Sequence, residues 1–295
     1  IIETVAGYSS TPAFSGDGQM ATDAELSSPT SVLGFEDSTI YLSDSDNNRI
    51  RELIHSIGGT PMEPPSLFIE TLIGNGTSSS TGDDGPISAA TIHGPMQTWL
   101  DSSQTYLYIA EYGGDTAHRV RRVDLFSHTV TTLAGTGFGG SSGDGFAASS
   151  ADLNGPHGVW GNSVDELYIS EHTSGQVRVV SLSSGIIEKY AGTGTLGYNG
   201  DNIAATSAQL YYPAYLAGDT AGNLFIADNT NHRIRKISYS TGIISTYAGD
   251  GLTGSVDNDN AVATAGNVPY PLGLFLLPST NDLYITSAWH QVRKV

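Results

Sequence analysis

The chain has 295 residues and a formal net charge of −18, from 12 Lys and Arg against 30 Asp and Glu. A surface of this charge repels phosphate, which argues against nucleic acid and anionic membranes as partners. The absence of cysteine excludes disulfides, thiolate metal sites and cysteine nucleophiles. No apolar run approaches the roughly 20 residues of a membrane helix, so no membrane insertion is expected. The chain starts without Met, which predicts a processed protein or a piece of a larger one.

One strand–turn–strand pattern recurs along the chain. An apolar strand leads into a polar turn and then into a second strand that carries Arg, at residues 41–53, 107–123, 167–180, 224–237 and 283–295. Nearly all of the Lys and Arg residues lie in that second strand. Because the cations stand at a fixed place in every repeat, we expect them to be structural and to pair with neighbouring carboxylates.

A longer unit surrounds this pattern. A strand ending in Gly is followed by a Gly- and Asp-rich loop, and then by a small-residue segment such as 203–209, which predicts one short helical turn. A proline then opens the next strand, and these prolines are Pro29, Pro95, Pro156, Pro213 and Pro271. They recur roughly every 60 residues, and four strands per unit at this period predict propeller blades rather than a helical solenoid.

The predicted fold is therefore an all-β five-bladed β-propeller of four-stranded antiparallel blades, in one domain over residues 1–295. The blades are expected at 29–74, 95–135, 156–192, 213–249 and 271–295 plus 1–7. The last blade lacks a fourth strand, and residues 1–6 (IIETVA) match 243–248 (IISTYA). The N-terminal strand is therefore expected to complete that blade and close the ring without a free edge. Blade 1 alone carries a long insertion, at residues 55–67.

Residues 231–235 (NHRIR) are the best-formed copy of the repeated turn, residues 47–51 and 117–121 match it in part, and residues 174–178 and 289–293 depart further. In this pattern the chain resembles the NHL-repeat family of β-propellers over essentially its whole length. The resemblance implies a propeller, in a family that more often has six blades. In the related amidating lyases, a His after the strand-opening proline binds zinc on three blades. Here only His157 stands at that place, and one ligand does not make a zinc site.

Two sets of carboxylates recur with the repeat. The acid that ends the first strand of the pattern is expected to pair with Arg, His or backbone donors of its own turn; this set is Asp44, Glu111, Glu171 and Asp228. The Gly- and Asp-rich loops carry the second set, which is Asp17, Asp83, Asp144, Asp201 and Asp257. Calcium takes several carboxylate and carbonyl oxygens, so it is the cofactor that these loops could bind. Hydrogen bonds from Asp to its own loop amides are the alternative.

A ligand-binding surface is predicted near the mouth of the propeller channel. His157 and Met96 follow their strand-opening prolines, and Tyr211, Tyr212 and Tyr215 flank Pro213. Tyrosine offers contact area and a hydroxyl group, which suits a sugar or a peptide. Packing between blades is the alternative interpretation of the same tyrosines.

These patterns favour a non-enzymatic, extracellular or secreted interaction module that binds a protein or a carbohydrate. It would be one domain of a larger adhesive or filamentous protein, beside neighbouring domains or further copies. The sequon at Asn75 would be glycosylated in a host that modifies such sites. No HExxH motif is present. The alternative is a metal-assisted hydrolase or lyase with its site at the channel mouth, since fold alone does not separate the two functions.

Overall fold

The computed structural model describes residues 3–8, 12–34, 39–55, 67–162, 164–253, 262–288 and 291–295, without the side chains of His55 and Asp115. It confirms the expected fold class, because the strands form five antiparallel sheets that are the blades of an all-β five-bladed propeller. The sequence predicted one domain over 1–295. The chain divides into two compact units, Ile1–Thr132 with two sheets and Leu133–Val295 with three.

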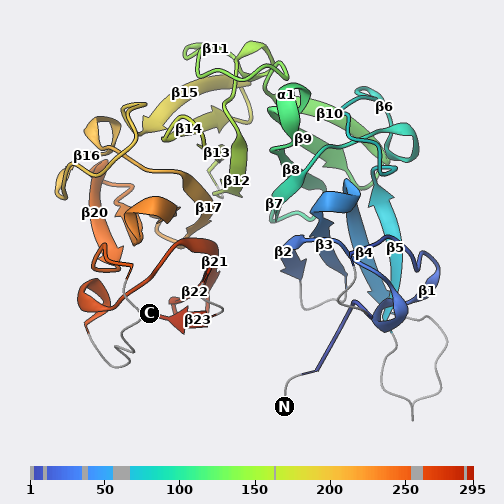
Figure 1. Cartoon of the computed structure of the whole chain (residues 1–295). Helices are drawn as coiled ribbons and strands as arrows, with labels where there is room; N and C mark the ends of the chain where they lie inside the picture. The colour runs from blue at the N-terminus through green and yellow to red at the C-terminus, as the bar shows by residue number, and fades with distance from the viewer. Residues whose placement is uncertain are drawn as a thin grey trace. The chain divides into compact units, whose positions relative to one another are not determined.

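The first unit contains two five-stranded sheets. The first sheet has the order β1-β5-β4-β3-β2, from β1 (Gln19–Met20), β2 (Pro29–Gly34), β3 (Ile40–Asp44), β4 (Arg49–His55) and β5 (Leu67–Ile73). The second has the order β6-β10-β9-β8-β7, from β6 (Gly85–Pro86), β7 (Pro95–Leu100), β8 (Tyr106–Glu111), β9 (Arg119–Asp124) and β10 (Thr129–Ala134). The two sheets pack with β2 beside β7 (Figure 1).

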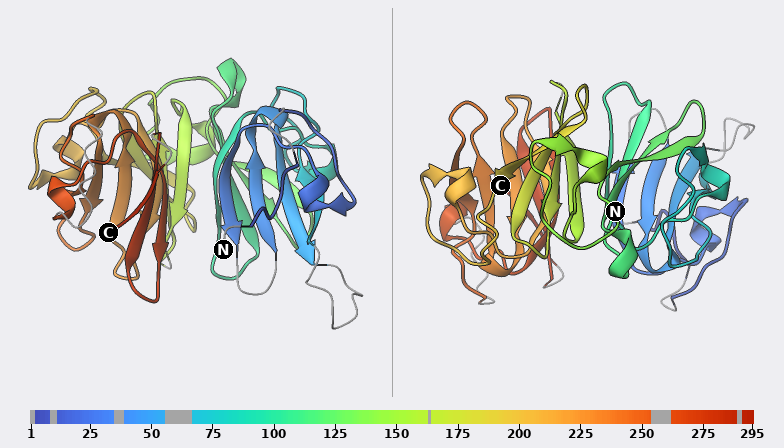
Figure 2. Two further views of the ribbon diagram at one scale, coloured as in Figure 1. Left: turned by 60° about the horizontal axis from the view of Figure 1, so that its bottom comes forward. Right: turned by 90° about the horizontal axis from the view of Figure 1, so that it is seen from above.

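The second unit contains two five-stranded sheets and one three-stranded sheet. Figure 2 shows the ribbon of this unit from two further sides, in colours from green to red. The first of them has the order β11-β15-β14-β13-β12, from β11 (Phe146–Ala147), β12 (Pro156–Gly161), β13 (Glu166–Glu171), β14 (Gln176–Ser181) and β15 (Ile186–Ala191). The next has the order β16-β20-β19-β18-β17, from β16 (Ile203–Ala204), β17 (Pro213–Gly218), β18 (Leu224–Asp228), β19 (Arg233–Ile237) and β20 (Ile243–Ala248). The last consists of β21 (Pro271–Leu277), β22 (Asp282–Ser287) and β23 (Gln291–Lys294). Strands β12, β17 and β21 pack in succession.

The helices of the described residues are single turns in the connections. The 3₁₀ turns are η1 (Ala21–Asp23), η2 (Ser45–Asn47), η3 (Ile87–Ala89), η4 (Ala148–Ser150), η5 (Ala205–Ser207), η6 (Asn229–Asn231) and η7 (Ala263–Ala265), and one α-helical turn is α1 (Gly114–Ala117). The turn η5 lies where the small-residue segment predicts one. Within the described ranges no helix has the length and apolar character needed to cross a membrane.

Each of the five strand-opening prolines begins a strand, as the sequence predicts. Proline has no N–H to give to a ladder, so the first position of a strand suits it. In β17, Pro213 pairs with Asp228 at the end of β18, and the register shifts directly after it. The other four prolines pair in the same way with the last residue of the neighbouring strand. The repeat therefore brings the strand-opening proline and the strand-ending acid together.

Two details of the predicted blades are corrected. Four of the sheets have five strands rather than four, because a two-residue strand from the small-residue segment pairs with the outermost long strand. A strand this short has no alternation by which the sequence could reveal it. The last sheet has three strands, and the described residues 3–6 form no strand. Residues 56–66, most of the predicted insertion, lie outside the described residues.

Gly7, which follows the expected N-terminal strand, nevertheless makes the same backbone hydrogen bond as Gly192, its equivalent in the repeat. Gly7 N–H donates to Ala21 O at 2.9 Å, just as Gly192 N–H donates to Ala205 O at 3.0 Å after β15. The alignment of the N-terminal segment with the repeat is thus correct at Gly7. The strand expected before it is not formed by the described residues 3–6, so that part of the prediction is wrong.

Strands β13 and β18 are covered on both faces, as their continuous apolar runs indicate. All five residues of β18 are buried, and so are the last five of β13. Between these two sheets Trp160 packs on Tyr168, with ring centroids 5.8 Å apart. Gly218 at the end of β17 leaves room for that indole, because a Cβ there would lie 2.3 Å from Cη2 of Trp160.

We therefore expect Gly218→Ala to lower the free energy of unfolding by about 1–3 kcal/mol, as overpacking of a filled core does. Gly266→Ala is the matched control, because its φ is −77° and its added Cβ would meet nothing closer than 3.5 Å. Urea denaturation of both variants measures the difference. Equal stability of the two variants would show that Trp160 is not held against Gly218.

Candidate functional site

A fully buried arginine lies between two carboxylates in each of the four five-stranded sheets. The four arginines, Arg51, Arg121, Arg178 and Arg235, are among the largest fully buried side chains of the described chain. One partner is the acid that ends the preceding strand, at 3.3–3.4 Å, and it is also fully buried. The prediction that this acid pairs with the Arg of its own turn is confirmed. The other partner is the aspartate of the Gly- and Asp-rich loop, at 2.6–3.0 Å.

In the fourth sheet this arrangement also fixes the backbone that precedes β17. Arg235 Nη1 lies 3.3 Å from Asp228 Oδ2, and Arg235 Nη2 lies 3.0 Å from Asp201 Oδ1. The other oxygen of Asp228 accepts the backbone N–H of Tyr211 at 2.8 Å. Asn231 Nδ2 donates to Asp228 Oδ2 at 2.8 Å. The buried charges are therefore paired and hydrogen-bonded, which is the condition under which ions are tolerated in a core.

The loop aspartates predicted to bind calcium have arginine partners here. Asp17, Asp83, Asp144 and Asp201 each contact a guanidinium, and Asp257 lies outside the described residues. No group of three or more His, Asp or Glu side chains is placed to hold a metal ion within the described ranges. Calcium at these loops stays a prediction, and pairing with arginine accounts for the four described aspartates.

The second sheet departs from this pattern at Glu111. In the other sheets the third residue after the acid donates to it, as Asn231 does to Asp228 and Ser174 does to Glu171. The longer turn of the second sheet has Gly114 at that position. Glu111 Oε2 is buried and has no hydrogen-bond partner among the described residues. Burial outweighs the attraction of Arg121 and raises the pKa of Glu111 to about 7.

A cluster of five aromatic rings occupies the junction of β12, the turn after β13 and the start of β17. We call it the ring cluster; it consists of His157, His172, Tyr211, Tyr212 and Tyr215. His157 and His172 are stacked with centroids 4.9 Å apart, and His172 and Tyr212 are stacked at 4.8 Å with 8° between their planes. Tyr215 lies 5.3 Å from His157, and Tyr211 lies 4.9 Å from Tyr212.

The ring cluster has no formal charge at neutral pH. Burial, and next to it the neighbouring His172, lower the pKa of His157 to about 3. Burial lowers the pKa of His172 to about 4. Both imidazoles are therefore neutral under physiological conditions. His157 and Tyr215 are only 7% and 4% exposed, whereas His172, Tyr211 and Tyr212 are partly exposed. A ligand could reach the cluster only through these last three rings.

The backbone at Tyr212 is strained. Its φ is +54°, and the residue before the proline has a positive φ in every sheet, where the others are Ser28, Gly94, Gly155 and Tyr270. Glycine adopts this left-handed conformation freely, whereas a bulky residue does so at a cost of about 1–2 kcal/mol. Tyr212 therefore stands where the repeat would accept glycine. Strain of this kind is often found at functional sites.

The structure brings together four of the five residues predicted to bind a ligand. His157, Tyr211, Tyr212 and Tyr215 belong to the ring cluster, while Met96 lies on β7 of the first unit. His157 and Tyr215 were expected to reach a ligand directly, but their burial gives them a supporting place behind the other rings. His172 was missed, since only its position after the strand-ending acid Glu171 distinguishes it. The exposed Asn75 Oδ1 accepts the N–H of Thr77 at 2.9 Å, so the predicted sequon lies on the surface.

Comparison with known proteins agrees with the repeat architecture. No protein-family model matches the chain. The chain is 28% identical over 232 residues to Protein SUPPRESSOR OF QUENCHING 1, chloroplastic, of Arabidopsis thaliana, covering 75% of this chain and 21% of that protein. It is 25% identical over 289 residues to NHL repeat-containing protein 2 of Gallus gallus, covering 87% of this chain and 36% of that protein. The chain thus spans well under half the length of these relatives.

Solved structures share the fold. An auxiliary nutrient binding protein from Bacteroides ovatus superposes with a TM-score of 0.59 at 16% identity, over 91% of this chain and 59% of that chain. A structural genomics protein of unknown function from Bacteroides thetaiotaomicron gives 0.59 at 17% identity, over 99% and 74%. A streptogramin B lyase gives 0.51 at 13% identity, over 90% and 68%. At these identities the likeness shows the fold alone.

The five blades and their repeated turns define the chain as a β-propeller repeat protein. Relatives named NHL repeat-containing protein 2 support the resemblance to NHL-repeat β-propellers that the repeated turns indicate.

We expect Arg235→Met to lower the free energy of unfolding by about 3–5 kcal/mol, because it leaves Asp228 buried without its charge partner. Arg233→Met is the control: Arg233 is partly exposed and its guanidinium donates to the carbonyls of Asn231 and Asp250. Its loss should cost about 1 kcal/mol. Chemical denaturation compares them. If Arg235→Met were as stable as Arg233→Met, the buried pairing would not be holding the sheet.

Glu111 predicts a dependence of stability on pH. Since its pKa is raised to about 7 in the fold, protonated Glu111 contributes stability that is complete below the unfolded pKa of 4.5 and is lost as pH rises through about 7. Glu111→Gln mimics the protonated acid. It should gain about 1–3 kcal/mol over the wild type between pH 5 and pH 8. The control Glu188→Gln, at an exposed residue, should show the same pH dependence of the free energy of unfolding as the wild type. A stability difference between Glu111→Gln and the wild type that does not change with pH would contradict the raised pKa.

Proposed function

We propose that this chain is a non-enzymatic binding module that takes a neutral carbohydrate on the ring cluster of its second unit. The observation that carries the proposal is Tyr212, a bulky residue kept in a left-handed conformation where Gly94 and Gly155 stand in other sheets. Its ring is stacked on His172 and partly exposed. A side chain retained against backbone strain, at the accessible end of a stack, is placed for contact with a ligand.

The chemistry of the cluster suits a sugar. The C–H face of a pyranose packs on a flat aromatic ring, and the tyrosine hydroxyls can donate to sugar hydroxyls or accept from them. The neutral imidazoles leave the stack without a charge to be desolvated when a neutral ligand binds. The likeness in fold to an auxiliary nutrient binding protein is consistent with a binding role.

A protein ligand is the closest alternative, because exposed tyrosines also anchor protein interfaces. A metal-assisted hydrolase or lyase is the other alternative, and it would need a divalent cation bound in stoichiometric amount. We favour binding without catalysis because the described part of the ring cluster presents stacked rings rather than converging ligands.

We also propose that the module acts outside the cell, as a domain of a larger adhesive or filamentous protein. The exposed sequon at Asn75 and the strongly acidic composition support this. Neighbouring domains or further copies of the chain would be its partners in such an assembly.

The test is binding of cellohexaose, mannohexaose and xylohexaose by isothermal titration calorimetry. We expect at least one to bind, and Tyr212→Gly to weaken that binding by roughly tenfold or more through loss of the ring contact. Stability should change little, since relief of the left-handed strain, about 1–2 kcal/mol, offsets the lost stacking.

Tyr270→Gly is the matched control. Tyr270 has φ +44° at the same position before its own proline, and it packs against His232 rather than in the ring cluster. Its loss should leave the affinity within about twofold of the wild type. Absence of binding to all three sugars, or equal weakening by both substitutions, overturns the carbohydrate proposal. Cleavage of a sugar during the titration would favour the enzyme instead.

A further inference from the structure

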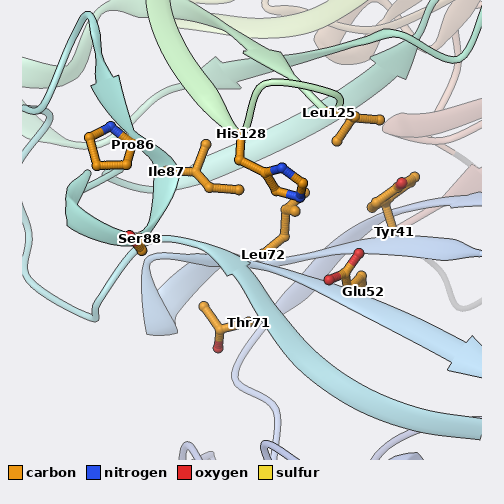
Figure 3. A pocket seen from close by; sticks show the side chains of 9 residues that line it. All are labelled: Tyr41, Glu52, Thr71, Leu72, Pro86, Ile87, Ser88, Leu125 and His128. Carbon is orange, nitrogen blue, oxygen red and sulfur yellow. The ribbon is translucent and has the colours of Figure 1, made fainter.

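A cavity of about 450 Å³ lies between the two sheets of the first unit. Tyr41, Glu52 and Leu72 line it from the first sheet, and Ile87 and His128 line it from the second (Figure 3). Figure 3 shows the Glu52 carboxyl beside the Tyr41 ring, with the His128 imidazole over Leu72. The cavity is thus lined by both apolar and polar side chains, the latter including Thr71, Ser88 and His128, and it carries one carboxyl group.

The repeat shows what normally occupies this place. Glu52 pairs in register with Tyr41, as Lys236 pairs with Phe225 in the fourth sheet. The residues at the position of Glu52 in the other sheets are Arg122, Val179, Lys236 and Lys294. A cation is therefore the usual residue here, and the first sheet has an anion in its stead.

In the fourth sheet an ammonium group is held between two rings. Lys236 Nζ lies 5.1 Å from the centroid of Phe225 and 5.8 Å from that of Tyr247. In the fourth sheet, Tyr247 follows Thr246, the ladder partner of Arg235. In the first sheet, Leu72 follows Thr71, the ladder partner of the equivalent Arg51. Leu72 therefore stands at the place of Tyr247. The smaller side chain leaves space where the fourth sheet has a ring, and the ammonium is missing beside it.

The carboxyl of Glu52 is not neutralised within the described part of the first unit, where it makes no ion pair. Residues 56–66, outside the described ranges, contain no Lys or Arg. Glu70 lies directly opposite Glu52 in the ladder, and like charges in that position repel. Burial and Glu70 raise the pKa of Glu52, against a small opposing effect of His128. An arriving cation would relieve this repulsion.

We propose that this cavity binds the primary ammonium group of an aliphatic amine, with the ammonium between Glu52 and the face of Tyr41. The alkyl chain would pack against Leu72 and Ile87. The bound amine would take the place that the Lys236 side chain fills in the fourth sheet. A carboxylate supplies a charge-assisted hydrogen bond, and an aromatic face adds a cation–π contact.

The probe is n-butylammonium, and n-butanol is its neutral counterpart. At pH about 8 alkylamines carry a positive charge. Binding is measured on the full chain by ligand-observed NMR at low ionic strength. We expect saturable binding of n-butylammonium and binding of n-butanol that is weaker by about tenfold or more.

Three variants make the test specific. Glu52→Gln keeps the shape of the cavity and removes the charge, so affinity should fall by about tenfold or more. Leu72→Tyr rebuilds the ring of the fourth sheet, fills the cavity and should abolish binding. Glu188→Gln removes one exposed carboxylate from another sheet and should leave affinity within about twofold. Circular dichroism confirms that each variant is folded.

Equal binding of n-butanol, or unchanged affinity in Glu52→Gln, overturns the proposal, and the second result does so even if Leu72→Tyr fails to fold. Nα-acetyl-lysine-N-methylamide distinguishes the source of the amine. If it binds at least about tenfold more tightly than n-butylammonium, the cavity takes a lysine side chain of a protein. If n-butylammonium binds as well or better, the cavity takes a free amine. Both results support the proposed ammonium site.

Discussion

The guanidinium buried between two carboxylates is the interaction on which each five-stranded sheet depends. Arg235 alone would be too costly to bury, but Asp228 and Asp201 reach it from the turn and from the loop. The loop is thereby tied to the strands, and Asp228 also holds the N–H of Tyr211. In the first and third sheets Asp44 and Glu171 accept the N–H of Ser27 and Asn154 in the same way, so the backbone before the strand-opening proline is held alike in three sheets. The side chains at that place are then free to differ.

Much of this arrangement could be predicted from the sequence, because its partners are close along the chain. The prolines and the strand-ending acids recur in register, and Asp228 and Arg235 belong to one strand–turn–strand pattern. The pairing of Asp201 with Arg235 could not be predicted, since 34 residues separate them and the loop amides offered Asp201 an equally plausible partner. The two-residue strands were missed because two residues carry no alternation.

The candidate site was predictable to the same extent. Tyr211, Tyr212 and Tyr215 drew attention as a group around Pro213, and the fold brings His157 to them from another sheet. The burial of His157 and Tyr215 could not be inferred, because it depends on how β12 and β17 pack together. His172 lies in a turn where the repeat tolerates many side chains, so the sequence carried no signal for it. The left-handed conformation of Tyr212 is likewise visible only once the backbone is known.

A repeat protein contains its own controls, because the same backbone position is occupied by different side chains in different sheets. A side chain that fits its position better than its counterparts needs no functional explanation. Tyr212 fits worse than glycine would, and Glu52 faces Glu70 where Lys236 has no such conflict. Each departure carries a free-energy cost, which Gly94 and Gly155 avoid at the position of Tyr212, whereas Ser28 and Tyr270 also adopt the left-handed conformation there. Selection for stability alone would remove such residues. Selection for binding is therefore the better explanation for Tyr212 and Glu52.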